Sequence, residues 1–351
     1  MKRRSSIPIP VGSIVIGGDH PIAIQSMCTV PISNTSACIA QIHQLNQCGA
    51  DLVRVALPDR ESLEFLPEVL ERTDPIPLIA DVHYDYKIAI EAIHQGIPKI
   101  RLNPGNIKNA ERIRDIAFEA KRMGVSIRVG ANSGSLPEDL AHLLKAEALA
   151  EAAMREVRIL EEAGFDQIIV AVKASDIQQT LEATRSVASQ CSYPLHIGLT
   201  EAGTLFSSLI KSSALIGSLL QEGIGDTIRY SITGDPIYEV RAAKILLGSL
   251  GLKKGPIVIA CPTCGRTDAP VEEWAEQIEA FLGFCDVSIT IAVMGCAVNG
   301  IGEGKEADLG IAGTKHGGVI FRKGKVVAAY PKDQLWNRFF VLLQEVIRER
   351  A

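Results

Sequence analysis

The sequence predicts an α/β protein: an N-terminal (β/α)8 TIM barrel followed by a small α+β domain. Short β-type runs alternate eight times with longer amphipathic segments over about 250 residues, the repeat number and size of such a barrel. A stretch rich in Gly and Lys then interrupts this alternation, and the last hundred or so residues contain strand and helix patterns of their own. A doubly wound parallel sheet is the competing architecture.

The eight expected barrel strands are short apolar runs separated by helix-type segments. They are residues 21–27, 52–57, 78–83, 99–103, 126–130, 167–172, 195–199 and 227–232. Apolar residues at helical spacing predict helices between them, such as 110–123 and the Ala-, Leu- and Glu-rich segment 136–163.

The boundary between the two domains is expected after residue 250. Gly248, Gly251, Gly255 and Pro256 punctuate the chain there, so the domains are 1–250 and 251–351. The second domain is expected to contain a strand at 257–260, a helix at 268–282 and a strand at 289–293. A Gly-rich tract then extends to residue 318, and a last helix spans 332–350.

Composition excludes several classes of protein. With 47% hydrophobic residues in 351, the chain can form a sizeable core, and its net charge of −5 argues against nucleic acid as a partner. No apolar run approaches the roughly 18 residues of a membrane span, and Pro8 and Pro10 interrupt any signal-peptide pattern. We therefore expect a cytoplasmic protein whose eight cysteines serve metal or redox chemistry rather than disulfides.

Cationic residues occur in or directly after five of the expected strands. They are Arg54, Arg101, Arg128, Lys173 and Arg229. A lone cation in a buried strand is costly unless it is paired, and the carboxyl ends of barrel strands form the active site. The five together predict a pocket for a small polyanion such as a phosphate ester; the alternative is that each pairs with a structural carboxylate.

Polar residues accompany these cations at the same strand ends. They are Asp81, His83, Asn103, Asn132 and, after the seventh strand, Glu201. The turns around Asn103 and Asn132 contain glycine, so their backbone N–H groups could also bind an anion.

Three cysteines follow two strands of the second domain. Cys261 and Cys264 form a C-x-x-C turn after one strand, and Cys296 follows the other. Such a set indicates a redox dithiol, part of a zinc site or an iron–sulfur cluster. Cys285, like the barrel cysteines Cys28, Cys38, Cys48 and Cys191, is interpreted as a packing thiol.

Glu303 is the candidate for a fourth metal ligand. It lies seven positions after Cys296 in a Gly-rich segment interpreted as a loop; the alternative is a solvated loop acid. Three thiolates and one exchangeable carboxylate suit a cluster that binds substrate oxygen at one iron.

Motifs across nearly the whole chain resemble those of one family. In the barrel they are Gln25-Ser-Met27, Arg101-Leu-Asn-Pro-Gly-Asn-Ile107, the segment 128–136, Lys173-Ala-Ser175 and Thr200-Glu-Ala-Gly203. In the second domain they are Cys261-Pro-Thr-Cys-Gly-Arg266, Val293-Met-Gly-Cys296 and the segment 306–313. On these motifs the chain is identified as a member of the 4-hydroxy-3-methylbut-2-enyl diphosphate synthase family, in its two-domain bacterial form. Members usually carry proline at the position of Ile301.

The resemblance implies an activity in non-mevalonate isoprenoid biosynthesis. The substrate would be 2-C-methyl-D-erythritol 2,4-cyclodiphosphate, opened reductively to 4-hydroxy-3-methylbut-2-enyl diphosphate with loss of water. Two single electrons would come from flavodoxin or ferredoxin. The family also implies a homodimer in which the cluster domain of one subunit covers the barrel mouth of the other.

The resemblance also implies a role for each site residue. A [4Fe–4S] cluster would be held by Cys261, Cys264, Cys296 and Glu303. The diphosphate would be bound by Arg54, Arg101, Arg128, Lys173 and Arg229, helped by Asn103, Asn132, Ser231, Asp81 and His83. Glu201 would be an active-site acid.

Two other functions are alternatives to this one. The first is a non-catalytic, zinc-stabilised binder of an anionic metabolite. The second is a barrel aldolase that uses Lys173 as a Schiff-base nucleophile.

Overall fold

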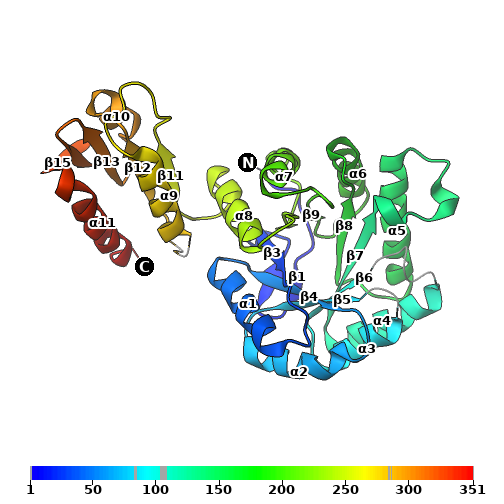
Figure 1. Cartoon of the computed structure of the whole chain (residues 1–351). Coiled ribbons are helices and arrows are strands. Elements are labelled where there is room, and N and C mark those ends of the chain that lie inside the picture. Colours follow the sequence, from blue (N-terminus) through cyan, green and yellow to red (C-terminus); the bar gives the residue numbers. More distant parts are fainter. Residues whose placement is uncertain (1, 83–84, 103–108, 284, 286, 351) are drawn as a thin grey trace. The chain divides into compact units, whose positions relative to one another are not determined.

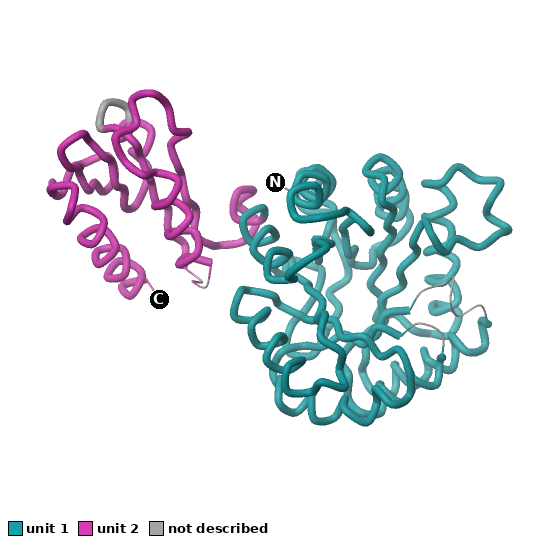
Figure 2. Tube along the Cα trace, viewed as in Figure 1, with its two compact units in different colours: residues 1–246 teal, residues 247–351 magenta. Residues whose placement is uncertain are grey.

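A computed structural model describes residues 2–82, 85–102, 109–283, 285 and 287–350. The chain divides into two compact units, Met1–Leu246 and Leu247–Ala351 (Figure 2). The boundary expected from the sequence, after residue 250, lies just beyond the end of helix α8 at Ser249. Among the described helices, none is long and apolar enough to cross a membrane.

The first unit is a nearly closed parallel barrel, which confirms the predicted fold class. Its strands are β3 (Ala23–Met27), β4 (Leu52–Leu57), β5 (Leu78–Val82), β6 (Lys99–Leu102), β7 (Ser126–Asn132), β8 (Ile168–Lys173), β9 (His196–Ile197) and β10 (Thr227–Ile228). They are ordered β8-β7-β6-β5-β4-β3-β10-β9, and a parallel bridge from Val170 to Leu195 brings the two ends together.

Helices lie on the outer side of the barrel strands (Figure 1). They are α1 (Thr35–Gln47), α2 (Ser62–Thr73), α3 (Tyr86–His94), α4 (Ala110–Met123), α5 (Lys145–Glu162), α6 (Ile177–Gln190), α7 (Leu205–Gln221) and α8 (Ile237–Ser249). Each follows a strand, so every strand is covered by helix on one side and faces the barrel interior on the other.

A hairpin at the N-terminus closes the floor of the barrel. Strands β1 (Ile9–Val11) and β2 (Ile14–Ile16) pair antiparallel, and Gly12 at their turn adopts a φ of 55°, which favours glycine. Ile9, Val11 and Ile16 pack against the inward residues Ala23, Leu52, Ile79 and Ile169. The amino ends of the strands are thereby sealed, and the carboxyl ends form the mouth.

Two local predictions in the barrel were wrong. The helix expected over 136–163 begins only at Lys145, because Pro137 is extended and two 3-10 turns, Ser133–Ser135 and Glu138–Leu140, precede it. Strands β9 and β10 have two residues each instead of five or six.

The second unit is a five-stranded mixed sheet. Its strands are β11 (Ile257–Ala260), β12 (Thr290–Met294), β13 (Leu309–Thr314), β14 (Gly317–Arg322) and β15 (Lys325–Pro331), in that spatial order. The first three are parallel to one another and the last two antiparallel to their neighbours. Its helices are α9 (Val271–Leu282), α10 (Ala297–Glu303) and α11 (Lys332–Arg348). The Gly-rich tract, which extends to residue 318, therefore contains helix α10, strand β13 and the start of β14.

The two faces of this sheet are covered differently. Helices α9 and α11 pack on one face, where the rings of Trp274 and Trp336 stack with centroids 5.5 Å apart. Helix α10 lies on the other face at very short range, since a Cβ on Gly300 would be 2.7 Å from the Cβ of Met294. Glycine at this position is what allows the helix to lie on the strand.

Candidate functional site

The five predicted cations all belong to the barrel and alternate with outward-facing apolar residues. Arg54 is in β4, Arg101 in β6, Arg128 in β7 and Lys173 at the end of β8, while Arg229 directly follows β10. The ladder register places Asp81 beside Arg101, and Arg101 beside Arg128. Two arginines are thus direct neighbours on one wall of the barrel interior.

Two buried carboxylates partner some of these cations. Asp81 accepts a hydrogen bond from Arg101 Nη1 at 3.1 Å, and its other oxygen lies 3.6 Å from Arg54 Nε. Glu239, in the first turn of α8, binds Arg229 through both oxygens. Arg54 also donates to the Met27 sulfur at 2.9 Å.

Some nitrogen atoms of these cations are buried without a hydrogen-bond partner among the described residues. Arg128 is 3% exposed, and its Nε and Nη1 have no hydrogen-bond partner among the described residues; the same holds for Arg101 Nε. Burial, followed by the charges of Arg54 and Arg101, lowers the pKa of Arg128 well below its usual range. Burial and the nearby arginines likewise lower the pKa of Lys173. This arrangement stores unfavourable electrostatic energy that a bound anion would relieve.

Lys99, which the sequence analysis did not select, adds a sixth cation to this interior. It is fully buried, its Nζ has no partner among the described residues, and burial lowers its pKa strongly. Lys99 is the first residue of β6, where a lysine side chain usually reaches solvent. Its position in the sequence therefore did not indicate that it is buried. Glu239 was not predicted as a site residue, because it lies in a helix and not at the end of a strand.

The three predicted cysteines follow the carboxyl ends of two neighbouring strands, β11 and β12. Cys261 directly follows β11, and its N–H donates to Val293 O at 2.9 Å, while Cys296 lies two residues after β12. The turn after Cys264 folds back so that Asp268 N–H donates to Gly295 O at 3.1 Å. Parallel strands end at the same edge, which explains why sequence spacing placed these residues correctly relative to the strands.

Arg266 lies among the three thiols. Its pKa is raised first by a hydrogen bond with Cys264 and then by the charges of Cys264, Cys296 and Cys261. The pKa of the Cys264 thiol is lowered, mainly by hydrogen bonds from the Arg266 backbone and side chain. Within the described part of the chain, no three His, Cys, Asp or Glu side chains are close enough to enclose a metal ion. A C-x-x-C turn with a third cysteine at the same edge is nevertheless a suitable donor set for an iron–sulfur cluster.

Comparison with known proteins places both halves of the chain. The family model described as the GcpE TIM-barrel domain matches residues 6–244, and the model described as the GcpE protein C-terminal domain matches residues 257–345. The chain belongs to the GcpE family. The five barrel cations (the cation row: Arg54, Arg101, Arg128, Lys173 and Arg229) lie in the first of these domains. The three cysteines (the cysteine edge: Cys261, Cys264 and Cys296) lie in the second.

Relatives of this GcpE chain are similar over their full length. A protein of Natranaerobius thermophilus is 46% identical over 99% of this chain and 98% of its own, and one of Caldicellulosiruptor saccharolyticus is 46% identical over 97% of each. A protein of Thermotoga maritima is 45% identical over 97% of this chain and 98% of its own. All three are named 4-hydroxy-3-methylbut-2-en-1-yl diphosphate synthase (flavodoxin).

Solved structures resemble the barrel of this GcpE chain. Dihydropteroate synthase from Stenotrophomonas maltophilia has a TM-score of 0.53 at 16% identity, covering 70% of this chain and 98% of that one. 3-Dehydroquinate dehydratase from Geobacillus kaustophilus has a TM-score of 0.50 at 16% identity, covering 71% and 99%. At such identity these likenesses show the barrel fold alone.

The other predicted barrel residues of GcpE are placed as follows. Asn132 ends β7 opposite Lys173, and Ser231 is half-buried in the turn after β10. Glu201 is exposed after β9 with a φ of 52°, a conformation that non-glycine residues rarely adopt and that often marks functional positions. His83 and Asn103 lie outside the described residues.

Glu303 does not lie with the cysteines in this structure. The segment interpreted as a loop is helix α10, with Cys296 at its N-cap and Glu303 as its last residue. Seven residues correspond to about two turns and a rise of about 10 Å, so the two residues share a helix face but are well separated along it. Ile301 is compatible with this helix, whereas a proline at its position would lack the N–H that a helix interior uses.

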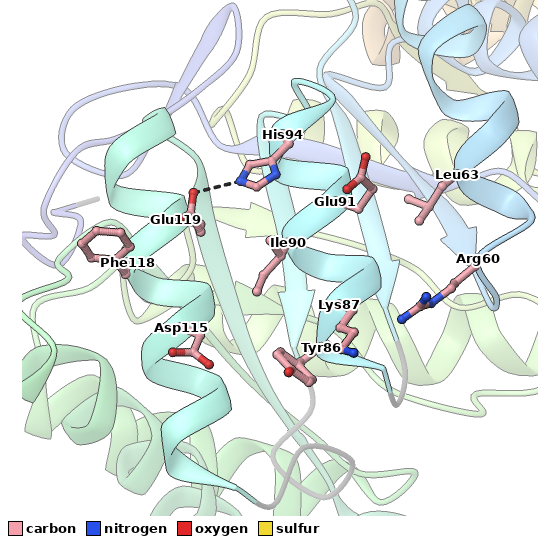
Figure 3. Close-up of a pocket in the computed structure, with 10 residues that line it drawn as sticks. All are labelled: Arg60, Leu63, Tyr86, Lys87, Ile90, Glu91, His94, Asp115, Phe118 and Glu119. Atoms are coloured by element: carbon pink, nitrogen blue, oxygen red, sulfur yellow. Dashed lines mark hydrogen bonds and ion pairs between the residues drawn. The ribbon is translucent and has the colours of Figure 1, made fainter.

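A groove on the outside of the barrel is separate from this cation site. It has a volume of about 730 Å³ and lies between α3 and α4, with His94 Nε2 2.9 Å from Glu119 Oε2 across it (Figure 3). Of the predicted site residues that the structure describes, none lines it. The groove is therefore no part of the predicted chemistry.

A buried acid behind the cation row provides a test of the barrel's electrostatics. Glu156 of α5 is 4% exposed, and burial raises its pKa to about 8, opposed by the charge of Arg101. The pKa of a glutamate in the unfolded chain is about 4.3. At pH values between about 4.3 and about 8, folded Glu156 keeps a proton that the unfolded chain has lost, so the stability of the folded state falls as pH rises. Glu156→Gln removes this titration. We expect the variant to melt at higher temperature than wild type, by a margin that grows from pH 5 to pH 8.

Thermal unfolding followed by circular dichroism at pH 5, 6.5 and 8 measures this margin. Glu147→Gln, an exposed residue of the same helix, is the matched control and should change little at any pH. A margin for Glu156→Gln that is independent of pH would contradict the assignment.

Proposed function

We propose that this protein reduces 2-C-methyl-D-erythritol 2,4-cyclodiphosphate to 4-hydroxy-3-methylbut-2-enyl diphosphate and water. The names of its relatives give this product, and the family resemblance implies the substrate. The observation that carries the proposal is a set of buried guanidinium nitrogens, Arg128 Nε and Nη1 and Arg101 Nε, that have no hydrogen-bond partner among the residues the structure describes. Arg54 and Arg101 share Asp81, and Arg229 pairs with Glu239, so a diphosphate would supply the negative charge and acceptor oxygens that Arg128 lacks among the described residues. The names of the relatives give no support to the zinc-stabilised binder.

In the proposed reaction the carbon–oxygen bond of the ring breaks at its phosphate ester. A hydroxyl leaves as water with one added proton, and two electrons complete the carbon–carbon double bond of the product. Arg54, Arg101, Arg128, Lys173 and Arg229 bind the phosphates, and Asn132 and Ser231 lie at the same strand ends. Glu201, held in its unusual conformation beside the mouth, is the proposed proton donor.

The second unit is proposed to carry the electrons. Cys261, Cys264 and Cys296 would hold a [4Fe–4S] cluster, which supplies single electrons and a Lewis-acidic iron when it is bound. Glu303 stays the predicted fourth ligand, although helix α10 keeps it two turns from Cys296. In this assignment residues 1–250 bind substrate and residues 251–351 hold the cluster. Flavodoxin, named for the relatives, is the proposed donor, with ferredoxin as the alternative.

We also propose that the protein acts as a homodimer in the cytoplasm. Phe206 and Ile210, one turn apart on α7, are 78% and 57% exposed and form an apolar face that a second copy would cover. Completion of the active site by the partner's cluster domain follows from the family resemblance. Analytical ultracentrifugation of the cluster-loaded chain tests this: a monomer at micromolar concentration would overturn it.

An anaerobic turnover assay tests the activity itself. Protein with a reconstituted cluster is mixed with the cyclic diphosphate and reduced flavodoxin or ferredoxin, and the products are separated by chromatography. We expect conversion to the linear diphosphate that depends on the reduced donor. Protein that is fully loaded with iron and binds the substrate, yet forms no product with either donor, would overturn the proposal.

A further inference from the structure

The Glu239 carboxylate accepts four hydrogen bonds at the barrel mouth. It is 2% exposed in the first turn of α8. Arg229 Nε donates to Oε2 and Arg229 Nη2 donates to Oε1, both at 3.1 Å, which is the parallel fork of a bidentate pair. Ser26 Oγ donates to Oε2 at 3.0 Å, and the backbone N–H of Ile232 donates to Oε1 at 3.2 Å.

This bonding pattern determines what Glu239 can do. Each carboxylate oxygen already accepts two hydrogen bonds, so the group acts here only as an acceptor and has little capacity left for a substrate. It is therefore unsuited to be a proton donor or a direct ligand of a phosphate. Its partners, in contrast, include one predicted phosphate-binding residue and the neighbour of another.

The bonds fix both of these elements. The fork holds two of the three guanidinium nitrogens of Arg229, so the third, Nη1, is presented in one orientation. The bond to Ile232 N–H holds the turn that carries Ser231, whose carbonyl also accepts from Ser208 Oγ of α7 at 2.9 Å. Ser26 connects the same carboxylate to β3.

We propose that Glu239 is a positioning residue that pre-orients Arg229 for a diphosphate. The inference rests on the proposed function and adds to it a residue that contacts no substrate. A guanidinium fixed before binding loses less conformational entropy when the anion arrives. Glu239 thus contributes to affinity through Arg229.

Asp226, directly before β10, provides a matched control. It is also a buried carboxylate, binding Arg3 Nη2 at 2.9 Å, Ser6 Oγ at 2.8 Å and Leu195 N–H at 2.8 Å. Asp226 precedes β10 whereas Arg229 follows it, so Asp226 lies at the floor end and Glu239 at the mouth. Replacing either carboxylate should lower stability, but only the loss of Glu239 should change anion binding.

The experiment measures the affinity of the full chain for inorganic diphosphate by isothermal titration calorimetry. It compares wild type, Glu239→Gln, Arg229→Met, the double variant and Asp226→Asn, with thermal midpoints for each. An amide at 239 places an N–H₂ group against the donors of Arg229, so we expect at least about tenfold weaker binding, as for loss of a charged pair. Arg229→Met should weaken binding by a similar factor. The double variant should bind like Arg229→Met alone, because the carboxylate acts through the arginine.

The outcomes separate this inference from the proposed function. Glu239→Gln binding like wild type, or weakening binding further in the Arg229→Met background, would overturn the positioning role alone. Wild type that does not bind diphosphate would overturn the proposed clamp and this inference together. Should Glu239→Gln fail to fold, Glu239→Asp serves instead: it keeps the charge but shortens the reach, and it should weaken binding in wild type and not in Arg229→Met.

Discussion

Arg128→Met weakens binding of the cyclic diphosphate and of inorganic diphosphate by at least about a hundredfold, and it raises the thermal midpoint of the ligand-free protein. The gain in stability follows from the environment of the side chain. Arg128 is buried beside Arg54 and Arg101, and its Nε and Nη1 lack partners among the described residues. A methionine of similar length removes the desolvation and repulsion but keeps the apolar packing. The loss of binding follows because those same nitrogens are the donors offered to a phosphate.

Calorimetric titration and thermal unfolding of the same protein samples measure both effects. Arg155→Met is the matched control: Arg155 is an exposed arginine of α5 that pairs with Glu151 and Asp139, so its loss should leave diphosphate affinity unchanged. Arg128→Met that binds diphosphate normally, or that melts well below wild type, would show that Arg128 is a structural cation rather than part of an anion site.

Cys296→Ala removes most of the iron from anaerobically reconstituted protein and reduces turnover to background. Cys296 follows β12, next to the strand that Cys261 and Cys264 follow. Without it, the proposed cluster keeps only the two thiolates of the C-x-x-C turn as cysteine ligands. Iron per chain, measured by colorimetric assay together with the visible absorption spectrum, should be about four in wild type and well below that in the variant.

Cys285→Ala is the control for this second prediction. Cys285 belongs to the same unit but packs against the core, with its Sγ 3.5 Å from Phe281 O. Its replacement should leave iron content and turnover near wild type. Equal iron in Cys296→Ala and wild type would rule out the cysteine edge as the cluster site. Glu303→Ala extends the series: loss of about one iron per chain would support a fourth ligand at that position.

The barrel could be predicted from sequence because its strands are buried on both sides. Continuous apolar runs such as Leu52–Leu57 identify the strands without help from long-range contacts. Strands β9 and β10 were overestimated because apolar residues continue past them while the backbone no longer pairs regularly. The floor hairpin was missed since its two strands have three residues each, below the length at which periodicity is informative.

Residues on strand ends could be found from sequence, whereas their partners could not. Arg54, Arg101 and Arg128 stand out as lone cations in apolar strands. Glu239 reaches Arg229 from a helix ten positions later, and nothing in the local pattern distinguishes it from an ordinary helical glutamate. Lys99 is concealed in a similar way, because burial at the start of a strand depends on the floor hairpin beneath it.

The region around Glu303 shows where composition misleads. Four glycines between residues 295 and 304 suggested a loop. Gly300 and Gly304 instead provide the space that lets α10 lie directly on Met294 and Ala292. Glycine there serves close packing instead of backbone freedom. The same local sequence therefore allows a helix that separates Glu303 from Cys296 along its axis.

A crystal structure of the full chain with the cyclic diphosphate bound tests the central claim most directly, since that claim concerns which nitrogens meet the phosphates. We expect phosphate oxygens within hydrogen-bond distance of Arg128 Nε and Nη1 and of Arg229 Nη1, with the fork to Glu239 intact. A ligand bound instead in the groove between α3 and α4, with Arg128 Nε and Nη1 out of reach of any phosphate oxygen, would contradict it.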